Sequence, residues 1–168
     1  MANYQACITW VLSLEDSTLK GEVTSDSDGL TRFGLCNTWN PELASQSYYT
    51  CDAPTALSIA KVTYRSKYWD KFQGDKIESD SVAAEILSFD VNDGPEAVKL
   101  VQRVLELTPD GIAGPVTVAA INVQDPQTLV FKIETAQIQY YFDIVEKNPA
   151  KQKYLQGWIN RAKRTYPV

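Results

Sequence analysis

Apolar residues recur at helical intervals along most of the chain and predict a mainly α-helical fold. The first such segment covers about residues 3–14, where Tyr4, Ile8, Val11 and Leu12 share one face. Six more helices are predicted: residues 52–69, residues 79–93, and four that begin near Pro95, Pro115, Pro126 and Pro149. The helix that begins near Pro126 and extends to about Lys147 has apolar residues on two sides, so we expect it to be central.

One part of the chain lacks helical periodicity. After Glu15, the stretch to Asn40 is rich in Ser, Thr, Asp and Gly, which predicts a loop or a short hairpin. Residues 24–29 resemble the start of a calcium loop, but Leu35 occupies the position that requires a bidentate Glu, which excludes that site. The sequence therefore predicts about seven helices with a small loop or hairpin insertion after the first.

A chain of 168 residues with 44% hydrophobic residues can bury a full core. We expect residues 1–93 to form one region and residues 94–168 a second helical region packed on it, in one compact unit. The sequence has no apolar run of the roughly 18 residues that a membrane-spanning helix needs, and no basic start followed by an apolar leader. We therefore expect synthesis in the cytoplasm without a signal peptide, and no stable insertion into a membrane.

The charge balance argues against nucleic acid as a partner. The formal net charge is −5, whereas phosphate binding depends on clustered Lys and Arg. Residues 1–93 hold 14 acidic and 7 basic residues, and residues 131–168 hold 3 acidic and 7 basic residues. A basic C-terminal face could meet an anionic polymer, although a solvated helix surface is the simpler interpretation.

The absence of histidine limits the possible chemistry. It excludes Ser-His-Asp and Cys-His nucleophiles and imidazole-based zinc sites. The three cysteines are too few and too scattered for a metal cage or a disulfide framework; Cys36 and Cys51 could pair after export, but free thiols are the default. We expect no cofactor and no metal, so carboxylates remain as the main catalytic groups.

Glu15 is the most informative carboxylate because it ends the buried face of the first helix. Burial beside apolar side chains and the partial negative charge of a helix C-terminus both favour the protonated acid. A general acid needs that proton. Taken alone, an ordinary acid at a helix end is the commoner interpretation of Glu15.

Two later residues are candidates for ligand contact. Trp69 ends the aromatic stripe of the helix predicted for residues 52–69 and could line a sugar groove, although such stripes are more often core. Asn92 lies near the end of the next helix, where Asp90 and Asn92 could instead cap or brace the junction at Gly94.

These features occur in an order that resembles glycoside hydrolase family 108, the lysozyme-like muramidases of phage endolysins and bacterial secretion-activator proteins, which carry a C-terminal peptidoglycan-binding region. The resemblance covers nearly the whole chain. It rests on Leu14-Glu15, Asp26, Gly29, Thr31 and Phe33-Gly34-Leu35, then on Tyr68-Trp69-Asp70, residues 89–94, Gln102, Asp110-Gly111, Gly114-Pro115, Thr117, Gly157-Trp158 and Arg161.

The resemblance implies a lysozyme-like fold and cleavage of the β-1,4 bond between N-acetylmuramic acid and N-acetylglucosamine in bacterial peptidoglycan. It implies Glu15 as general acid, Asp26 as partner carboxylate and Thr31 as the hydroxyl that positions water, with inversion as the favoured outcome. Trp69 and Asn92 would contact the substrate. We expect a monomer that reaches the wall after release, through a holin lesion or a dedicated secretion route.

The sequence departs from the family pattern directly after the catalytic position. Asp16 and Ser17 stand where the family has two glycines, and the loop to Asp26 is about two residues longer. Side chains there occupy space that a glycan would approach. This leaves a second hypothesis, a peptidoglycan-binding or secretion-accessory protein that no longer cuts, and a third, a helical interaction module.

Overall fold

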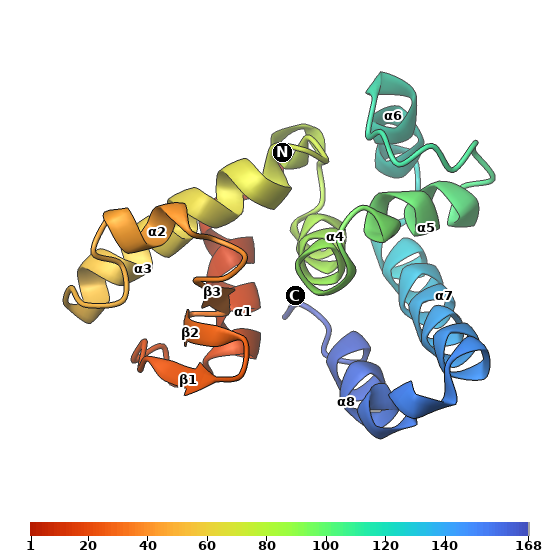
Figure 1. Cartoon of the computed structure of the whole chain (residues 1–168). Helices are drawn as coiled ribbons and strands as arrows, with labels where there is room; N and C mark the ends of the chain where they lie inside the picture. The colour runs from red at the N-terminus through yellow and green to blue at the C-terminus, as the bar shows by residue number, and fades with distance from the viewer. Residues whose placement is uncertain (168) are drawn as a thin grey trace.

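The computed structural model describes residues 1–167 and confirms a mainly helical fold with a small antiparallel sheet (Figure 1). Its α-helices are α1 (Tyr4–Glu15), α2 (Glu42–Ser45), α3 (Ala53–Tyr64), α4 (Asp80–Asp93), α5 (Glu96–Val104), α6 (Pro115–Asn122), α7 (Pro126–Lys147) and α8 (Gln152–Ala162). Short turns η1 (Arg65–Trp69), η2 (Gly74–Lys76) and η3 (Pro149–Lys151) extend or join them. Each of the seven predicted helices is present, and the four-residue α2 is additional.

Side-chain caps explain why four helices begin where they do. The side chain of Asn3 accepts a hydrogen bond from the amide of Ala6 at the start of α1. The side chain of Ser79 accepts one from the amide of Val82 at the start of α4. Asp52 and Asp125 cap α3 and α7, each of which has a proline in its first turn. These caps fix the N-terminal ends of the long helices.

The segment after α1, for which a loop or a short hairpin was predicted, folds into a hairpin with a third short strand. Strands β1 (Thr24–Asp26), β2 (Gly29–Arg32) and β3 (Leu35–Cys36) form one antiparallel sheet in sequence order. Thr24 pairs with Thr31 and Asp26 with Gly29, so Ser27 and Asp28 form the tip. The sheet, α2 and α3 make up one side of the molecule (Figure 1).

Arg32 attaches the hairpin to the chain that follows it. Its side chain is 6% exposed, and its guanidinium donates hydrogen bonds to the carbonyls of Gly21, Tyr48 and Cys51. The hydroxyl of Tyr48 in turn donates to the carbonyl of Arg32. These carbonyls would be left without partners if Arg32 moved, which is costly in a buried setting. Arg32 therefore helps to fix the position of the sheet.

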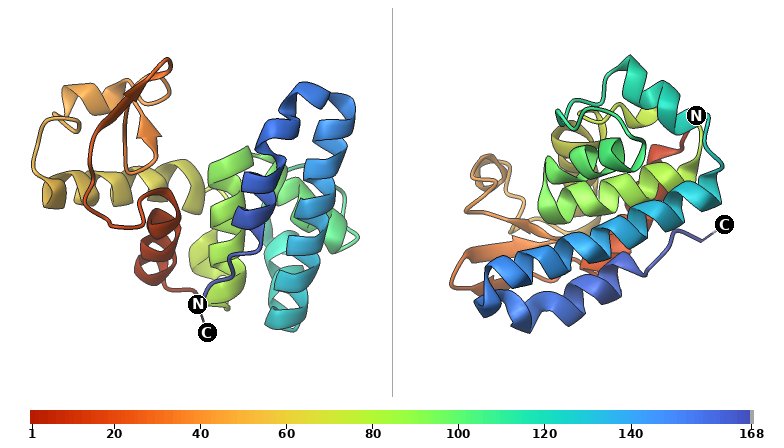
Figure 2. Two further views of the ribbon diagram at one scale, coloured as in Figure 1. Left: turned by 90° about the horizontal axis from the view of Figure 1, so that it is seen from below. Right: turned by 90° about the vertical axis from the view of Figure 1, so that its right-hand side faces the viewer.

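The other side of the molecule consists of packed helices, with α4, α7 and α8 side by side (Figure 2). Trp158 of α8 stacks on Tyr141 of α7 with ring centroids 5.3 Å apart. Tyr166, beyond α8, contacts the ring of Trp10 on α1 at 5.7 Å. The C-terminal region therefore packs directly against the first helix of the chain.

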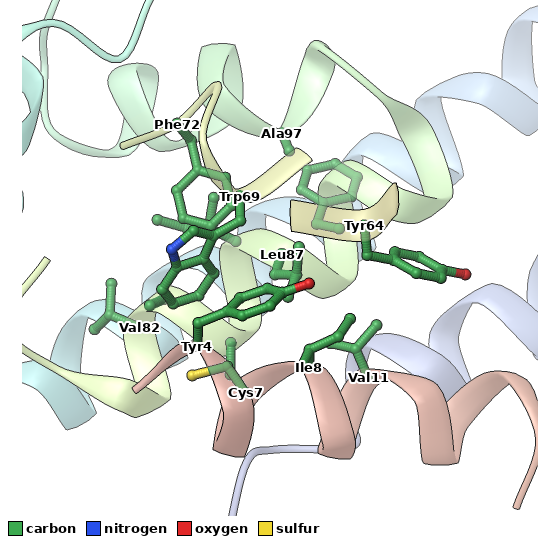
Figure 3. Packing of buried hydrophobic residues seen from close by; sticks show 14 of the residues in the cluster. Tyr4, Cys7, Ile8, Val11, Tyr64, Trp69, Phe72, Val82, Leu87 and Ala97 are labelled. Atoms are coloured by element: carbon green, nitrogen blue, oxygen red, sulfur yellow. The ribbon is translucent and has the colours of Figure 1, made fainter. Parts of the chain in front are cut away.

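The core lies where α1 meets the helices on both sides. The inward face of α1 consists of Tyr4, Cys7, Ile8 and Val11, which pack in one cluster with Trp69 and with Leu87 of α4 (Figure 3).

No helix within residues 1–167 is both long enough and apolar enough to cross a membrane.

Candidate active site

Glu15 is the last residue of α1 and borders an open cavity of about 290 Å³. The cavity is lined by residues of the loop after α1 and of the hairpin: Glu15, Asp16, Ser17, Thr18, Glu22, Thr24, Thr31, Phe33 and Gly34. The end of α1 and the face of the sheet therefore meet at one polar hollow. Its lining contains three carboxylic acids and several hydroxyl groups.

The loop after Glu15 is organised by Asp16. Its carboxylate accepts hydrogen bonds from the amide and hydroxyl of Thr18 and, at 2.7 Å, from the amide of Gly21. Partial burial acts to raise the pKa of Asp16, but the hydrogen bonds from Gly21 and Thr18 outweigh it and lower the pKa below its ordinary value. Asp16, one of the two departures from the family pattern, is thus a brace of its own loop.

Strand register brings Thr31 to the cavity. Thr31 on β2 pairs with Thr24 on β1, and both line the hollow beside Glu15. Alternation sends the next residue, Arg32, to the opposite, buried face. Glu22, which precedes β1, also lines the cavity; of its three carboxylic acids, Glu22 is the exposed one.

Asp26 lies at the end of β1, next to the tip of the hairpin. Its carboxylate is exposed and accepts a hydrogen bond from the amide of Asp28 at 2.8 Å. It is not part of the cavity lining, but it is two residues from Thr24, so the two side chains share a face of β1 about 7 Å apart along the strand.

Gly34 allows the hairpin to approach Glu15 closely. A Cβ atom at Gly34 would lie 2.6 Å from the hydroxyl of Tyr64 and 3.0 Å from Cγ of Glu15, and the backbone has a φ of +74°. Tyr64 is fully buried and donates to the carbonyl of Phe33 at 3.0 Å. Burial first, and Glu15 second, keep the pKa of Tyr64 well above its ordinary value, so this hydroxyl stays protonated.

Arg161 of α8 forms an ion pair with Glu15, with Nη1 2.7 Å from Oε1. The two side chains are only 16% and 20% exposed. This finding corrects the expected apolar surroundings of Glu15, because a guanidinium from the far end of the chain stands beside the carboxylate. The C-terminal helix therefore contributes to the site.

Comparison with known families identifies this arrangement. The model of a family described as glycosyl hydrolase 108 matches residues 9–94, which include Glu15, the loop and the hairpin. The chain belongs to glycosyl hydrolase family 108. A second model, described as a predicted peptidoglycan domain, matches residues 96–163, which include Arg161. This family 108 member is therefore a glycoside hydrolase that acts on peptidoglycan.

A solved structure supports the fold of the family 108 chain. The structure of Brucella abortus SagA is similar with a TM-score of 0.73 and 22% sequence identity, over 96% of this chain and 90% of that one. A sequence comparison with curated proteins gives no match.

Trp69 does not lie where the sequence analysis of this family 108 member placed it, in contact with substrate. Its side chain is fully buried, its ring lies 5.1 Å from that of Tyr4, and its indole N–H donates to Asp75 at 2.9 Å (Figure 3). A ring enclosed by the core cannot stack on a sugar. The simpler interpretation of the aromatic stripe, a core face, was the right one.

Asn92 lies outside the cavity as well. Its amide donates to the carboxylate of Asp93 at 2.7 Å and to the hydroxyl of Tyr141 at 3.0 Å, which joins α4 to α7. These contacts favour the bracing interpretation. A contact between Asn92 and substrate stays a prediction without support from the cavity.

Neither the place of Thr24 in the cavity nor the pairing of Arg161 with Glu15 was predicted from the sequence. Strand alternation could have found Thr24 once its pairing with Thr31 was known. Arg161 gave no local signal, because only the packing of α8 brings it to Glu15.

No group of three or more Cys, Asp or Glu residues within residues 1–167 is arranged to hold a metal ion.

Proposed function

We propose that this hydrolase is an N-acetylmuramidase, which cleaves the β-1,4 bond between N-acetylmuramic acid and N-acetylglucosamine. The observation that carries the proposal is the position of Glu15, at the end of α1 in an open polar cavity that it shares with Thr31. Glycoside hydrolysis needs a proton for the leaving oxygen and a second group on the other side of the sugar ring.

Glu15 acts as the general acid. Its Oε1 is paired with Arg161, whereas Oε2 lies beside Gly34, 3.1 Å from where a Cβ atom there would stand. Within residues 1–167 Oε2 has no ion-pair partner, so we assign it the proton that passes to the glycosidic oxygen as the bond from that oxygen to C1 breaks.

Asp26 acts as the partner carboxylate, with Thr31 positioning the attacking water. The water adds to C1, and its proton passes to Asp26. Asp26 shares a face of β1 with Thr24, which lines the cavity, and this supports the assignment. A separation of about 6.5 to 9.5 Å between the two carboxyl groups would give inversion, and we favour that outcome over retention.

Glu22 is the alternative partner because it lines the cavity itself. Its carboxylate is exposed to solvent, so a water molecule could reach it and be activated there. Asp26 is preferred because it is the position that the family pattern supplies.

We further propose that residues 94–168 hold the enzyme on the glycan strand while residues 1–93 cut it. The protein then acts at the bacterial cell wall, as a monomer that arrives through a holin lesion or a secretion system. The match of residues 96–163 to a predicted peptidoglycan domain supports this division.

A non-catalytic accessory protein is the second candidate. Asp16 and Ser17 favour it, because they line the cavity where the family has glycines. The hydrogen bonds that tie Asp16 to Thr18 and Gly21 weigh against it, because they direct this carboxylate into its own loop.

The test is product analysis after incubation of purified protein with isolated peptidoglycan. We expect soluble muropeptides with N-acetylmuramic acid at the new reducing ends, and none from Glu15→Gln. Glu146→Gln, at an exposed position on α7, is the control and should match wild type. Wall binding without products would support the accessory protein, and N-acetylglucosamine at the new ends would overturn the proposed bond.

A further inference from the structure

We propose that Arg161 is a positioning residue for Glu15, so that the last helix of the C-terminal region completes the active site at the end of the first helix. This inference rests on the proposed role of Glu15 as general acid. It assigns to the C-terminal region a part in the reaction itself, in addition to holding the wall.

The first observation is the geometry of the ion pair. The 2.7 Å separation of Nη1 and Oε1 is that of a charge-assisted hydrogen bond, and both side chains are mostly shielded from water. A mostly buried pair is screened less than a surface pair, so it restricts the rotation of the Glu15 carboxylate. The free oxygen, Oε2, is thereby held towards Gly34 and the cavity.

The second observation is that Arg161 is itself held in place. Its Nη2 donates to the carbonyl of Ser88 on α4 at 3.4 Å. The helix that carries it is anchored by the stacking of Trp158 on Tyr141 and by the buried Leu155 and Ala162. A rigid support of this kind suits a residue that fixes the orientation of another.

The third observation is a buried acid behind the guanidinium. Glu85 of α4 is 2% exposed, and its Oε2, like Nε of Arg161, has no hydrogen-bond partner in residues 1–167. Burial, and then Glu134, raise the pKa of Glu85 to about 8, although Arg161 acts to lower it. Near neutral pH Glu85 is therefore mostly uncharged and does not compete with Glu15 for the guanidinium.

The positive charge of Arg161 also acts on other titratable groups packed around the pair. Asp16 and Glu22 line the same cavity as Glu15. The charge of Glu15 or Arg161 also reaches Tyr64 of α3, Tyr68 of η1, and Glu85 and Asp93 of α4. Burial raises the pKa of Tyr64, Glu85 and Asp93, and Arg161 acts to lower it, so a change at Arg161 also removes its effect on these three groups.

The test is the measurement of kcat and KM for Arg161→Gln and Arg161→Lys in the full chain, with peptidoglycan as substrate. For Arg161→Gln we expect kcat to fall about tenfold or more with little change in KM, because a misplaced acid acts on the transition state. Arg161→Lys keeps a positive charge that can pair with Glu15 and should recover most of the lost kcat. Arg164→Gln, exposed one turn later, is the control.

The outcomes separate this inference from the proposed function. If wild type releases no products, the proposed function fails and the role of Arg161 fails with it. If wild type is active and Arg161→Gln keeps its kcat, the positioning role alone is overturned. A loss of kcat that Arg161→Lys does not recover would also overturn it, as would a rise in KM that accounts for the whole loss of kcat/KM. Thermal unfolding of both variants, with Arg161→Lys as the milder change, identifies a loss of fold.

Discussion

Gly34 of the hairpin and Glu15 of α1 are in close contact. A Cβ atom at Gly34 would stand 3.0 Å from Cγ and 3.1 Å from Oε2 of Glu15, and 2.6 Å from the hydroxyl of Tyr64. The backbone of Gly34 has a φ of +74°, which residues with a side chain rarely adopt. The carboxylate of Glu15 is thus confined between Arg161 on one side and the backbone of the hairpin on the other.

Gly34→Ala should therefore reduce both activity and stability. The added methyl group would displace the Glu15 side chain or the Tyr64 hydroxyl, and we expect kcat to fall about tenfold or more. The strained backbone and the crowding of the buried Tyr64 should cost about 1 to 3 kcal/mol of the free energy of unfolding. Kinetics on peptidoglycan and urea denaturation measure the two effects.

Gly157→Ala is the matched control. Gly157 is exposed within α8, and a Cβ atom there would meet no neighbour within 4 Å. Because alanine favours a helix interior, this variant should gain about 0.5 to 1 kcal/mol and keep its activity. Equal activity in the two variants would mean that the close approach at Gly34 does not matter for Glu15.

The helices could be predicted from the sequence because their signals are local. A capping Asp or Ser precedes α3, α4 and α7, and α3 and α7 also have a proline in the first turn. The apolar face of α1 follows directly from the spacing of its residues. The short α2 was missed because four residues are too few for a periodic pattern. The aromatic stripe on α3 and η1 showed that Trp69 lies on an apolar face. It did not show whether that face packs in the core or borders a groove.

The site could be predicted only where one segment carries it. Glu15 and Thr31 are close in sequence, and the structure brings both to one cavity. The pairing of Glu15 with Arg161 depends on how α8 packs across the molecule, which no local pattern encodes. The same holds for Asn92, whose partner Tyr141 is on α7.

Asp26→Asn tests the partner carboxylate with the hairpin tip intact. The amide oxygen of asparagine can still accept the hydrogen bond from the amide of Asp28, so the turn should remain. Loss of the negative charge and of the proton acceptor should lower kcat about a hundredfold or more. The release of reducing ends measures this loss, and circular dichroism verifies the fold.

Glu22→Gln is the comparison, since Glu22 lines the cavity but is not the position that the family pattern supplies. We expect less than about a tenfold fall in its kcat. If Glu22→Gln is the more damaged of the two, Glu22 is the partner carboxylate and the proposed role of Asp26 is wrong.

Arg32→Met should destabilise the fold, because Arg32 attaches the hairpin to the chain that follows it. The variant loses the hydrogen bonds to the carbonyls of Gly21, Tyr48 and Cys51 in a buried setting. We expect a loss of about 3 kcal/mol, since buried carbonyls without partners are costly. Urea denaturation measures the loss, and Lys20→Met, at an exposed position, should lose little. Similar midpoints for both variants would contradict the role of Arg32 as the attachment of the hairpin.

Glu85→Gln should remove a dependence of stability on pH. The pKa of Glu85 rises from 4.5 to about 8 through burial, so between these values the folded chain binds a proton that the unfolded chain has released. The contribution of Glu85 to stability therefore falls as pH rises from 4.5 to about 8, by at most about 1.4 kcal/mol per pH unit. Glutamine does not ionise, so the difference in the free energy of unfolding between the variant and wild type should grow in favour of the variant from pH 5 to pH 8.

Urea denaturation at several pH values in that window measures this difference, with Glu146→Gln as a surface control that should follow wild type. Parallel curves for wild type and Glu85→Gln would mean that water reaches this carboxyl group and that α4, α7 and α8 do not enclose it.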